Sequence, residues 1–139
     1  MKVLIDTNVI LDVLLERENF KEDSGRILSL SEHKKIKGYV SATAITDIYY
    51  IARKTFHDKE KALAVIKELL AFARVLKADE KSIKLAVKLH WKDFEDSVQY
   101  AIAKRSRIKA IITRNKNDYN DSEIAVFTPL EFLEAAGQL

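Results

Sequence analysis

The stretch that decides the fold is Val3-Leu4-Ile5-Asp6-Thr7-Asn8-Val9-Ile10-Leu11, near the start of the chain. A short apolar run ends abruptly at Asp6, and a second apolar run with helical spacing follows it. This pattern predicts a buried strand over Lys2–Asp6 and a helix capped by Thr7 or Asn8. Ligands of open α/β sheets bind just beyond the carboxyl ends of the strands. We therefore expect Asp6 to lie in a functional site.

The composition describes one soluble globular domain that spans residues 1–139. Hydrophobic residues make up 47% of the chain and charged residues 32%, a balance that excludes a disordered polypeptide. The absence of Cys excludes disulfides and thiolate metal sites and fits a reducing, cytoplasmic location. We see no signal peptide and no apolar run of the ~20 residues that a membrane span needs. The net charge of +3 permits a polyanionic partner without requiring one.

Strands and helices alternate along the rest of the chain. Apolar runs between polar breaks predict further strands at Lys37–Ser41, Arg74–Ala78, Ala110–Thr113 and Ile124–Phe127. Helical periodicity and capping residues predict helices at Ser24–Lys34, from Ser41 to Thr55, after Asp58, after Asp79, over Phe94–Arg107 and from Thr128 to near Gly137, with Asn115–Ser122 as a loop. The alternation predicts an α/β fold with a mostly parallel, roughly five-stranded sheet between two helical layers.

Four aspartates are candidates for one acidic site, namely Asp6, Asp47, Asp96 and Asp118. Asp47 is unusual because Asp disfavours helix interiors, yet it lies between two isoleucines. The others have simpler explanations, since Asp96 could belong to a capping box with the N-cap Asp93, and Asp118 could be a turn residue. Asp12 in the first helix is expected to be a solvated or salt-bridged surface acid.

Several carboxylates at one sheet edge would repel one another strongly in a low dielectric. A hard divalent cation removes that repulsion, and ligation by oxygen alone suits Mg²⁺ or Mn²⁺. Such a site can activate water for displacement at phosphorus. The chain has no Gly-rich phosphate loop or nucleophilic Cys, and its three histidines are too widely separated to form a typical metal motif.

Basic residues flank the fourth predicted strand. They are Lys104, Arg105, Arg107, Lys109, Arg114 and Lys116. Cations beside a carboxylate cluster would suit a phosphodiester backbone that approaches a metal ion, and we consider Arg114 and Lys116 as nucleic-acid contacts. The equally simple explanation for Lys104–Arg107 is a solvated helix end whose cations favour the helix dipole.

Three segments together resemble the PIN-domain ribonucleases, which include the toxins of VapBC-type toxin–antitoxin pairs. The segments are Val3–Asp12, Asp93–Gln99 with the trailing Ala101-Ile102-Ala103, and Ile111–Tyr119. Each segment is weak alone, but the three occur in the family's order and spacing over nearly the whole chain. The resemblance implies a three-layer α/β/α fold with strand order 3-2-1-4-5 and metal-dependent cleavage of RNA.

The resemblance also implies roles for individual residues. Asp6 and Asp96 would be metal ligands, Asp47 would take the second acidic position, and Asp118 or Asn115 the fourth. The residues that would orient these ligands through hydrogen bonds are Thr7, Asn8, Asp93 and Thr113. Asn115 would do the same if Asp118 binds the ion. Two departures stand out: the second position is more usually Glu than Asp, and many relatives have Asp where Asn115 stands.

The leading hypothesis from the sequence is therefore a Mg²⁺- or Mn²⁺-dependent endoribonuclease, and the alternative is an RNA- or antitoxin-binding module with a weakened site. A phosphotransfer domain is a third hypothesis. A haloacid-dehalogenase-type phosphatase requires a second Asp two residues after the first, where Asn8 stands, and a receiver requires an acidic pair at the end of the first strand, where Asp6 stands alone. The resemblance implies a small antitoxin partner and a homodimer. Tyr49, Tyr50, Leu63 and Ile66 could form the dimer interface, although core packing is the expected role for most of them.

Overall fold

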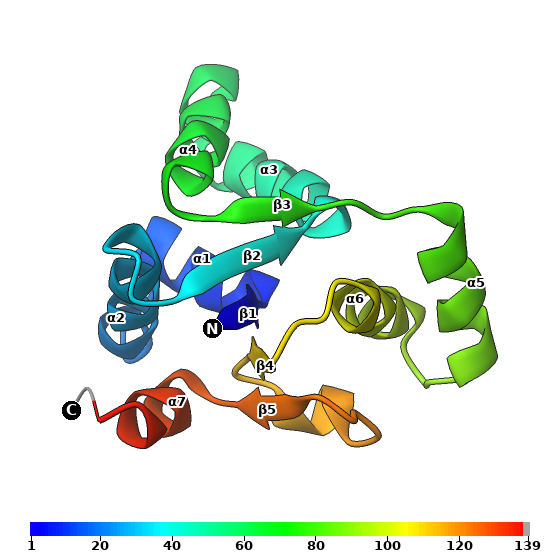
Figure 1. Ribbon diagram of the computed structural model, residues 1–139. Coiled ribbons are helices and arrows are strands. Elements are labelled where there is room, and N and C mark those ends of the chain that lie inside the picture. Colours follow the sequence, from blue (N-terminus) through cyan, green and yellow to red (C-terminus); the bar gives the residue numbers. More distant parts are fainter. Residues whose placement is uncertain (138–139) are drawn as a thin grey trace.

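The computed structural model describes residues 1–137 of the chain. Strands and helices alternate along it, as the sequence predicts (Figure 1). The elements in chain order are β1 (Lys2–Ile5), α1 (Thr7–Leu14), α2 (Lys21–Glu32), β2 (Lys37–Ser41), α3 (Ala42–Phe56), α4 (Lys59–Phe72), β3 (Arg74–Leu76), α5 (Glu80–Leu89), α6 (Phe94–Arg105), β4 (Ala110–Ile112), the 3₁₀ helix η1 (Lys116–Tyr119), β5 (Ala125–Phe127) and α7 (Pro129–Ala135).

The five strands form one parallel sheet in the order β3-β2-β1-β4-β5, which confirms the predicted topology. The central strand is β1, and its Leu4 pairs with Tyr39 of β2 and with Ile111 of β4. The chain leaves β1 in one direction across the sheet and returns on its other side at β4. The carboxyl ends of β1 and β4 therefore form the topological switch point, where ligands bind in such sheets.

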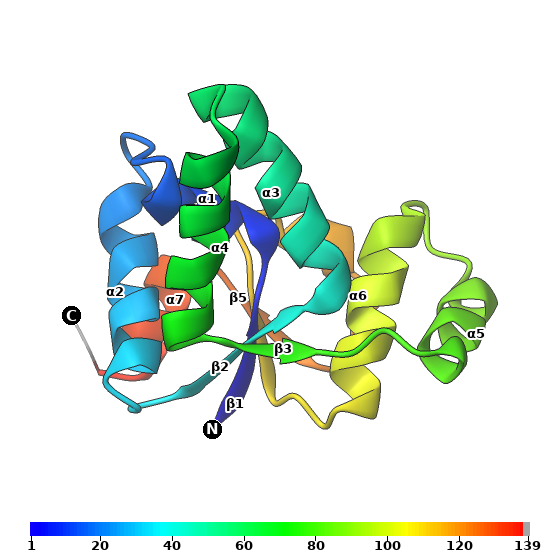
Figure 2. The same ribbon diagram turned by 90° about the horizontal axis from the view of Figure 1, so that it is seen from above.

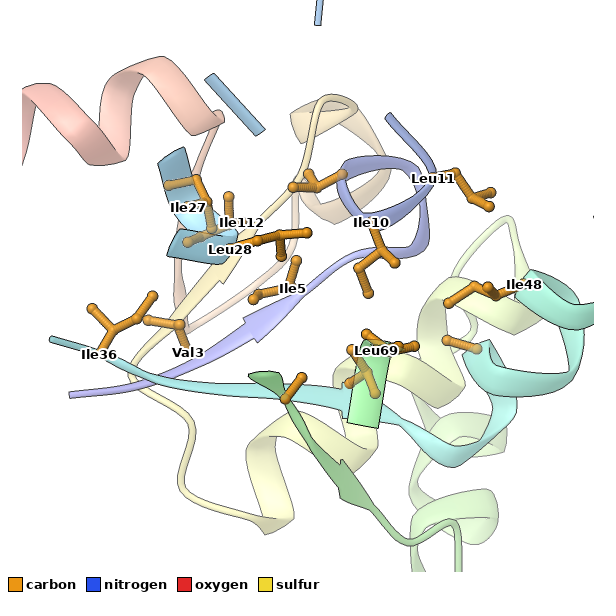
Figure 3. Packing of buried hydrophobic residues seen from close by; sticks show 14 of the residues in the cluster. Val3, Ile5, Ile10, Leu11, Ile27, Leu28, Ile36, Ile48, Leu69 and Ile112 are labelled. Atoms are coloured by element: carbon orange, nitrogen blue, oxygen red, sulfur yellow. The ribbon is translucent and has the colours of Figure 1, made fainter. Parts of the chain in front are cut away.

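Alternate residues of β1 face two different helical layers. Val3 and Ile5 belong to the larger core, with residues of α1, α2, α3, α4 and α7, and Figure 3 shows Ile5 beside Leu28 and Ile112. Leu4 points to the opposite face, where it packs with Tyr100 of α6. A strand that is buried on both faces needs a continuous apolar run, which explains why Val3–Ile5 contains no polar residue.

The capping residues predicted from sequence for α3 to α7 begin these helices as expected. Ser41, Asp58, Asp79 and Asp93 each accept a hydrogen bond from a backbone N–H in the first turn of α3, α4, α5 and α6. The Thr128–Glu131 pair forms a reciprocal capping box at α7. Side-chain oxygens satisfy N–H groups that have no partner inside the helix, so these signals are local and readable from sequence.

Several predicted boundaries were wrong by a few residues. The second helix begins at Lys21 instead of Ser24, and the third strand ends at Leu76 because β2, its neighbour, offers no further partner after Ser41. The predicted loop contains η1, which buries Tyr119. The N-cap of α1 is Asp6, not Thr7 or Asn8.

Of the four residues considered for a dimer interface, two are half-buried against the core and two are exposed. Tyr49 and Ile66 pack against the core as expected, but Tyr50 and Leu63 are exposed, and Tyr50 lines the same hollow as Asp47. Among residues 1–137, no helix has the length and apolar character required to cross a membrane.

Gly38 offers a test of how closely β2 approaches α2. An added Cβ would lie 2.9 Å from Ser31 Cβ and 3.1 Å from Ile5 Cδ1, so a side chain has no room. We expect Gly38→Ala to lower the free energy of unfolding by about 1–3 kcal/mol through overpacking. The matched control is Gly25→Ala in α2, where an added Cβ meets nothing within 4 Å. Removing a helix glycine there should stabilise the fold by up to about 1 kcal/mol. Urea unfolding measures both, and equal effects would contradict the close approach.

Candidate active site

Asp6 joins the ends of the two strands at the switch point. Its backbone N–H donates to Ile112 O at 2.9 Å, which extends the β1–β4 pairing by one residue. Its carboxylate turns back and accepts from Thr7 N at 2.7 Å, which begins α1. The side chain is consequently only 9% exposed. A carboxylate that is buried in this way requires hydrogen-bond donors.

Five donors surround the Asp6 carboxylate. In addition to Thr7 N, Oδ1 accepts from Gln99 Nε2 at 2.9 Å. Oδ2 accepts from Thr113 Oγ1 at 2.7 Å, from Tyr119 Oη at 3.4 Å and from Asn8 Nδ2 at 3.5 Å. Asn8 also donates to Thr113 Oγ1 and accepts from the Arg114 backbone N–H. These neutral donors fix the orientation of the carboxylate without cancelling its negative charge.

Gln99 and Tyr119 also hold Asp6, although neither was predicted from the sequence as a site residue. Gln99 Oε1 accepts from Ser41 Oγ at 3.1 Å, and its amide donates to both Asp6 and Tyr119 Oη, the latter at 2.6 Å. Burial and the nearby Asp6 raise the pKa of Tyr119 far above its usual value, so the phenol stays a neutral donor. The sequence does contain an indication of the role of Gln99, because it is the only amide in the otherwise apolar or small run from Ser97 to Ala103.

Asp96 carries the most perturbed carboxyl group of the site. Burial, and after it the negative charges of Asp93, Asp118, Asp6 and Glu95, raise its pKa to about 7. It lies in the first turn of α6, where the helix dipole would otherwise favour the ionised form. The first turn of α6 therefore holds more negative charge than the surrounding donors neutralise.

The four aspartates singled out from the sequence line one cleft of about 780 Å³. Asp6 follows β1, the exposed Asp47 lies on α3, Asp96 lies on α6 and the exposed Asp118 lies on η1. Thr7, Asn8 and Asn115 also line the cleft. Thr113 lies behind Asp6, and Asp93 caps α6, where it accepts from Asp96 N at 3.1 Å. The fold thus gathers residues that are 112 positions apart in sequence (6 and 118) around one hollow.

The cations beside β4 do not rim this cleft, because Arg17 is the only Lys or Arg among its described lining residues. Arg114 Nε lies 2.8 Å from Asp12 Oδ2, and its guanidinium lies 3.9 Å from the centre of the Phe20 ring. Lys116 pairs with Glu131 at 3.1 Å.

Asp12 was wrongly expected at the surface. It is fully buried and pairs with Arg114 and, at 3.6 Å, with Arg17, and Ser24 Oγ donates to it at 3.0 Å. It lies on the face of α1 that α2 covers, so its carboxylate is buried, while the side chains of both arginines are partly exposed.

The donor set fits a hard divalent cation in kind, because every candidate ligand is an oxygen. Within residues 1–137, however, no three His, Asp or Glu side chains stand close enough together to hold an ion by themselves. Mg²⁺ commonly keeps several of its waters and uses one or two carboxylates together with a substrate phosphate. The cleft is compatible with such a hydrated ion and does not form a closed protein cage.

The fold is that of a PIN domain. The family model described as PIN domain matches residues 2–117, and the chain belongs to this family. The family assignment removes the phosphotransfer alternative. Among curated proteins, the chain is 33% identical over 138 residues to Ribonuclease VapC1 of Aquifex aeolicus, covering 96% of this chain and 94% of that protein.

Solved structures agree on the fold. The chain superposes on a FitAB complex bound to a DNA fragment with a TM-score of 0.70 and 26% identity, covering 91% of this chain and 94% of the other. It superposes on DNA-bound VapBC from Salmonella typhimurium with a TM-score of 0.72 and 18% identity, covering 93% and 98%. At 18% identity the second match supports the fold alone.

The crowding of Asp96 predicts that its charge destabilises the metal-free protein. The pKa of this carboxyl is raised from 3.8 to about 7 in the folded protein. The protein therefore loses folding stability as pH rises from about 4 to about 7, and the loss is complete above pH 7. We expect Asp96→Asn to stabilise the fold at pH 8 in EDTA by about 1–2 kcal/mol, after allowance for partial exposure. The gain should shrink as pH falls towards 4.

Urea unfolding at several pH values measures this effect. Asp47→Asn is the matched control, because Asp47 lines the same cleft but is exposed and is not among the groups that raise the Asp96 pKa. Its stability should change by less than about 0.5 kcal/mol. A destabilised Asp96→Asn protein at pH 8 would contradict the proposed crowding.

Proposed function

We propose that this chain is a divalent-metal-dependent endoribonuclease that hydrolyses RNA phosphodiester bonds. The observation that carries the proposal is the meeting of Asp6 and the charge-crowded Asp96 at the switch point of a PIN fold. The 33% identical relative is named a ribonuclease, which supports the same activity here. Mg²⁺ and Mn²⁺ are the proposed ions because the donors are hard oxygens.

Asp6 and Asp96 are the proposed direct ligands. A divalent ion, when bound, supplies Lewis acidity that polarises a phosphodiester and acidifies water. Thr113, Gln99 and Tyr119 hold the Asp6 carboxylate in one orientation, so that little reorganisation is required when the ion and the substrate bind.

Asp47 and Asp118 are proposed to act at a greater distance from the ion. Both are exposed on the cleft wall, and Asp47 has one methylene less than the Glu usual at its position. They would hold waters of the hydrated ion. Asn115 would orient the η1 segment, since its backbone N–H donates to Thr113 Oγ1 at 3.1 Å.

The proposal extends to a toxin–antitoxin role. The solved relatives include VapBC and FitAB complexes, which favours a small antitoxin as partner. A homodimer, with the exposed Tyr50 and Leu63 as candidate contacts, and action in the cytoplasm, where RNA is available, belong to the same proposal.

Asp96→Asn gives a test in which activity and stability should change in opposite directions. We expect cleavage of a defined RNA pool in Mn²⁺ to fall at least about a thousandfold, because the lost ligand supports several kcal/mol of transition-state stabilisation. Asp6→Asn should lose activity equally. Asp121→Asn, an exposed loop carboxylate outside the cleft, should cleave as wild type does. Wild-type protein that cleaves no RNA in Mn²⁺ or Mg²⁺ would refute the proposal.

The alternative is a PIN-fold module that binds RNA or an antitoxin without cleaving RNA. The observation that favours it is the absence, within residues 1–137, of three converging carboxylates. Titration calorimetry with Mn²⁺ separates the two functions. The enzyme predicts saturable binding to wild type, weakened about 10- to 100-fold or more in Asp96→Asn. Wild type without saturable binding would favour the module.

A further inference from the structure

Cations occupy the amino ends of four neighbouring strands, at the opposite edge of the sheet from the acidic cleft. Lys2 of β1 pairs in register with Lys37 of β2, and Lys109 N donates to Lys2 O at 2.9 Å. Arg74 begins β3, the next strand beyond β2. Figure 2 shows the N-terminus together with the α2–β2 and α6–β4 turns along this edge. Lys2, Lys37 and Lys109 therefore lie side by side, Arg74 pairs in register with Tyr39 two residues further along β2, and all four are exposed.

These side chains share one face of the sheet. Side chains alternate along a strand, so Lys2 lies on the face of Leu4, and Lys109 on that of Ile111. Leu4, Ile111 and Tyr39 all belong to the core under α6. Lys2 Nζ lies 5.8 Å from the centre of the half-buried Tyr39 ring. The row of cations therefore lies on the face of the sheet that α6 covers, beyond the end of that helix.

A hollow of about 460 Å³ lies beside the row. Its lining includes Lys34, Lys37, Arg74 and Tyr39, with Glu32 as its one acid among the described residues. Lys34 comes from the turn between α2 and β2. We call Lys2, Lys34, Lys37, Arg74 and Lys109 the basic face.

The charges of the basic face are not neutralised by the protein. None of its five residues forms an ion pair within residues 1–137. Lys104, by contrast, pairs with Glu123 at 2.7 Å, and Arg105 pairs with Asp79 at 3.6 Å. Unpaired cations that are held at adjacent strand ends keep their full attraction for a polyanion.

The two ends of the sheet thus have opposite charge. Five acids line the cleft at the carboxyl end, where Arg17 is the only Lys or Arg among the described lining residues. A polyanion is repelled there until a cation binds, and the amino end attracts it. We propose that the basic face binds the phosphate backbone of RNA, at a distance from the cleavage site. This inference rests on the proposed function for the identity of the polyanion.

The dimensions allow one RNA to contact both ends. Lys2 and Asp6 are four residues apart along an extended strand, which is about 13 Å at ~3.3 Å per residue. Because β1 is buried on both faces, an RNA must pass around the helical layers, and its path is longer than this distance. Phosphates in a single strand of helical geometry are spaced ~3.4 Å apart along the axis, so at least about four phosphates separate the two contacts. A tetranucleotide in the cleft would therefore leave the basic face empty, whereas a long RNA would reach it.

The test is RNA binding in EDTA, where cleavage does not interfere. A labelled 30-nucleotide single-stranded RNA is titrated with wild type and with the triple variant Lys2→Gln, Lys37→Gln, Lys109→Gln at several salt concentrations. We expect the negative slope of log affinity against log salt to become shallower by about 2, since each of the three lost phosphate contacts contributes ~0.7. Affinity at low salt should fall at least about tenfold.

The matched control is Lys59→Gln, Lys61→Gln, Lys67→Gln, which removes the same charge from exposed positions of α4. Equal losses in the two triple variants, or none in the basic-face variant, would overturn the inference. Competition by poly-glutamate as effective as that by unlabelled RNA of equal charge would also overturn it, because the face would then be suited to acidic protein.

Cleavage in Mn²⁺ gives a second readout. The basic-face variant should lose kcat/KM on the 30-nucleotide RNA and keep it on a tetranucleotide. An equal loss on both substrates would overturn the inference. A wild type that cleaves neither RNA would contradict the proposed function, and the EDTA binding curves would still decide on the basic face.

Discussion

The structure depends on the burial of one carboxylate, that of Asp6, between the ends of β1 and β4. Its backbone continues the pairing of these strands, and its side chain begins α1. Thr113 and Gln99 complete its hydrogen bonds from elements that are distant in sequence. A buried charge is costly without such partners, so the same contacts that make the fold tolerate Asp6 also hold its carboxylate in one orientation at the cleft.

The distribution of charge gives the molecule two different ends. Aspartates gather where the strands end, and burial and mutual repulsion raise the pKa of Asp96 to about 7. Unpaired lysines and one arginine lie where the strands begin. A net charge of +3 hides this separation, because the sum is nearly balanced. Both ends would serve the proposed metal-dependent cleavage of RNA. The basic end would attract the polyanion that the acidic end repels in the absence of a bound cation.

Local signals in the sequence predicted the elements well. Asp58, Asp79 and Asp93 begin helices because their side chains bond to N–H groups only two or three residues away. The strand order followed from the family resemblance, and the sheet confirms it. Predictions about single side chains were less secure. Asp12 looks like a surface acid in sequence, yet α2 and Arg114 enclose it, a contact between positions 102 residues apart.

The sequence by itself determined the alternation of strands and helices and the starts of α3 to α7, because these depend on neighbours within a few residues, and it singled out the four aspartates that line the cleft. Only the tertiary structure decided that Gln99 and Tyr119 hold Asp6, that Arg114 is engaged by Asp12, and that lysines from separate strands form one face. The reason is physical. Hydrogen bonds, ion pairs and charge fields depend on distance in space, and a parallel sheet brings together residues that the chain keeps far apart.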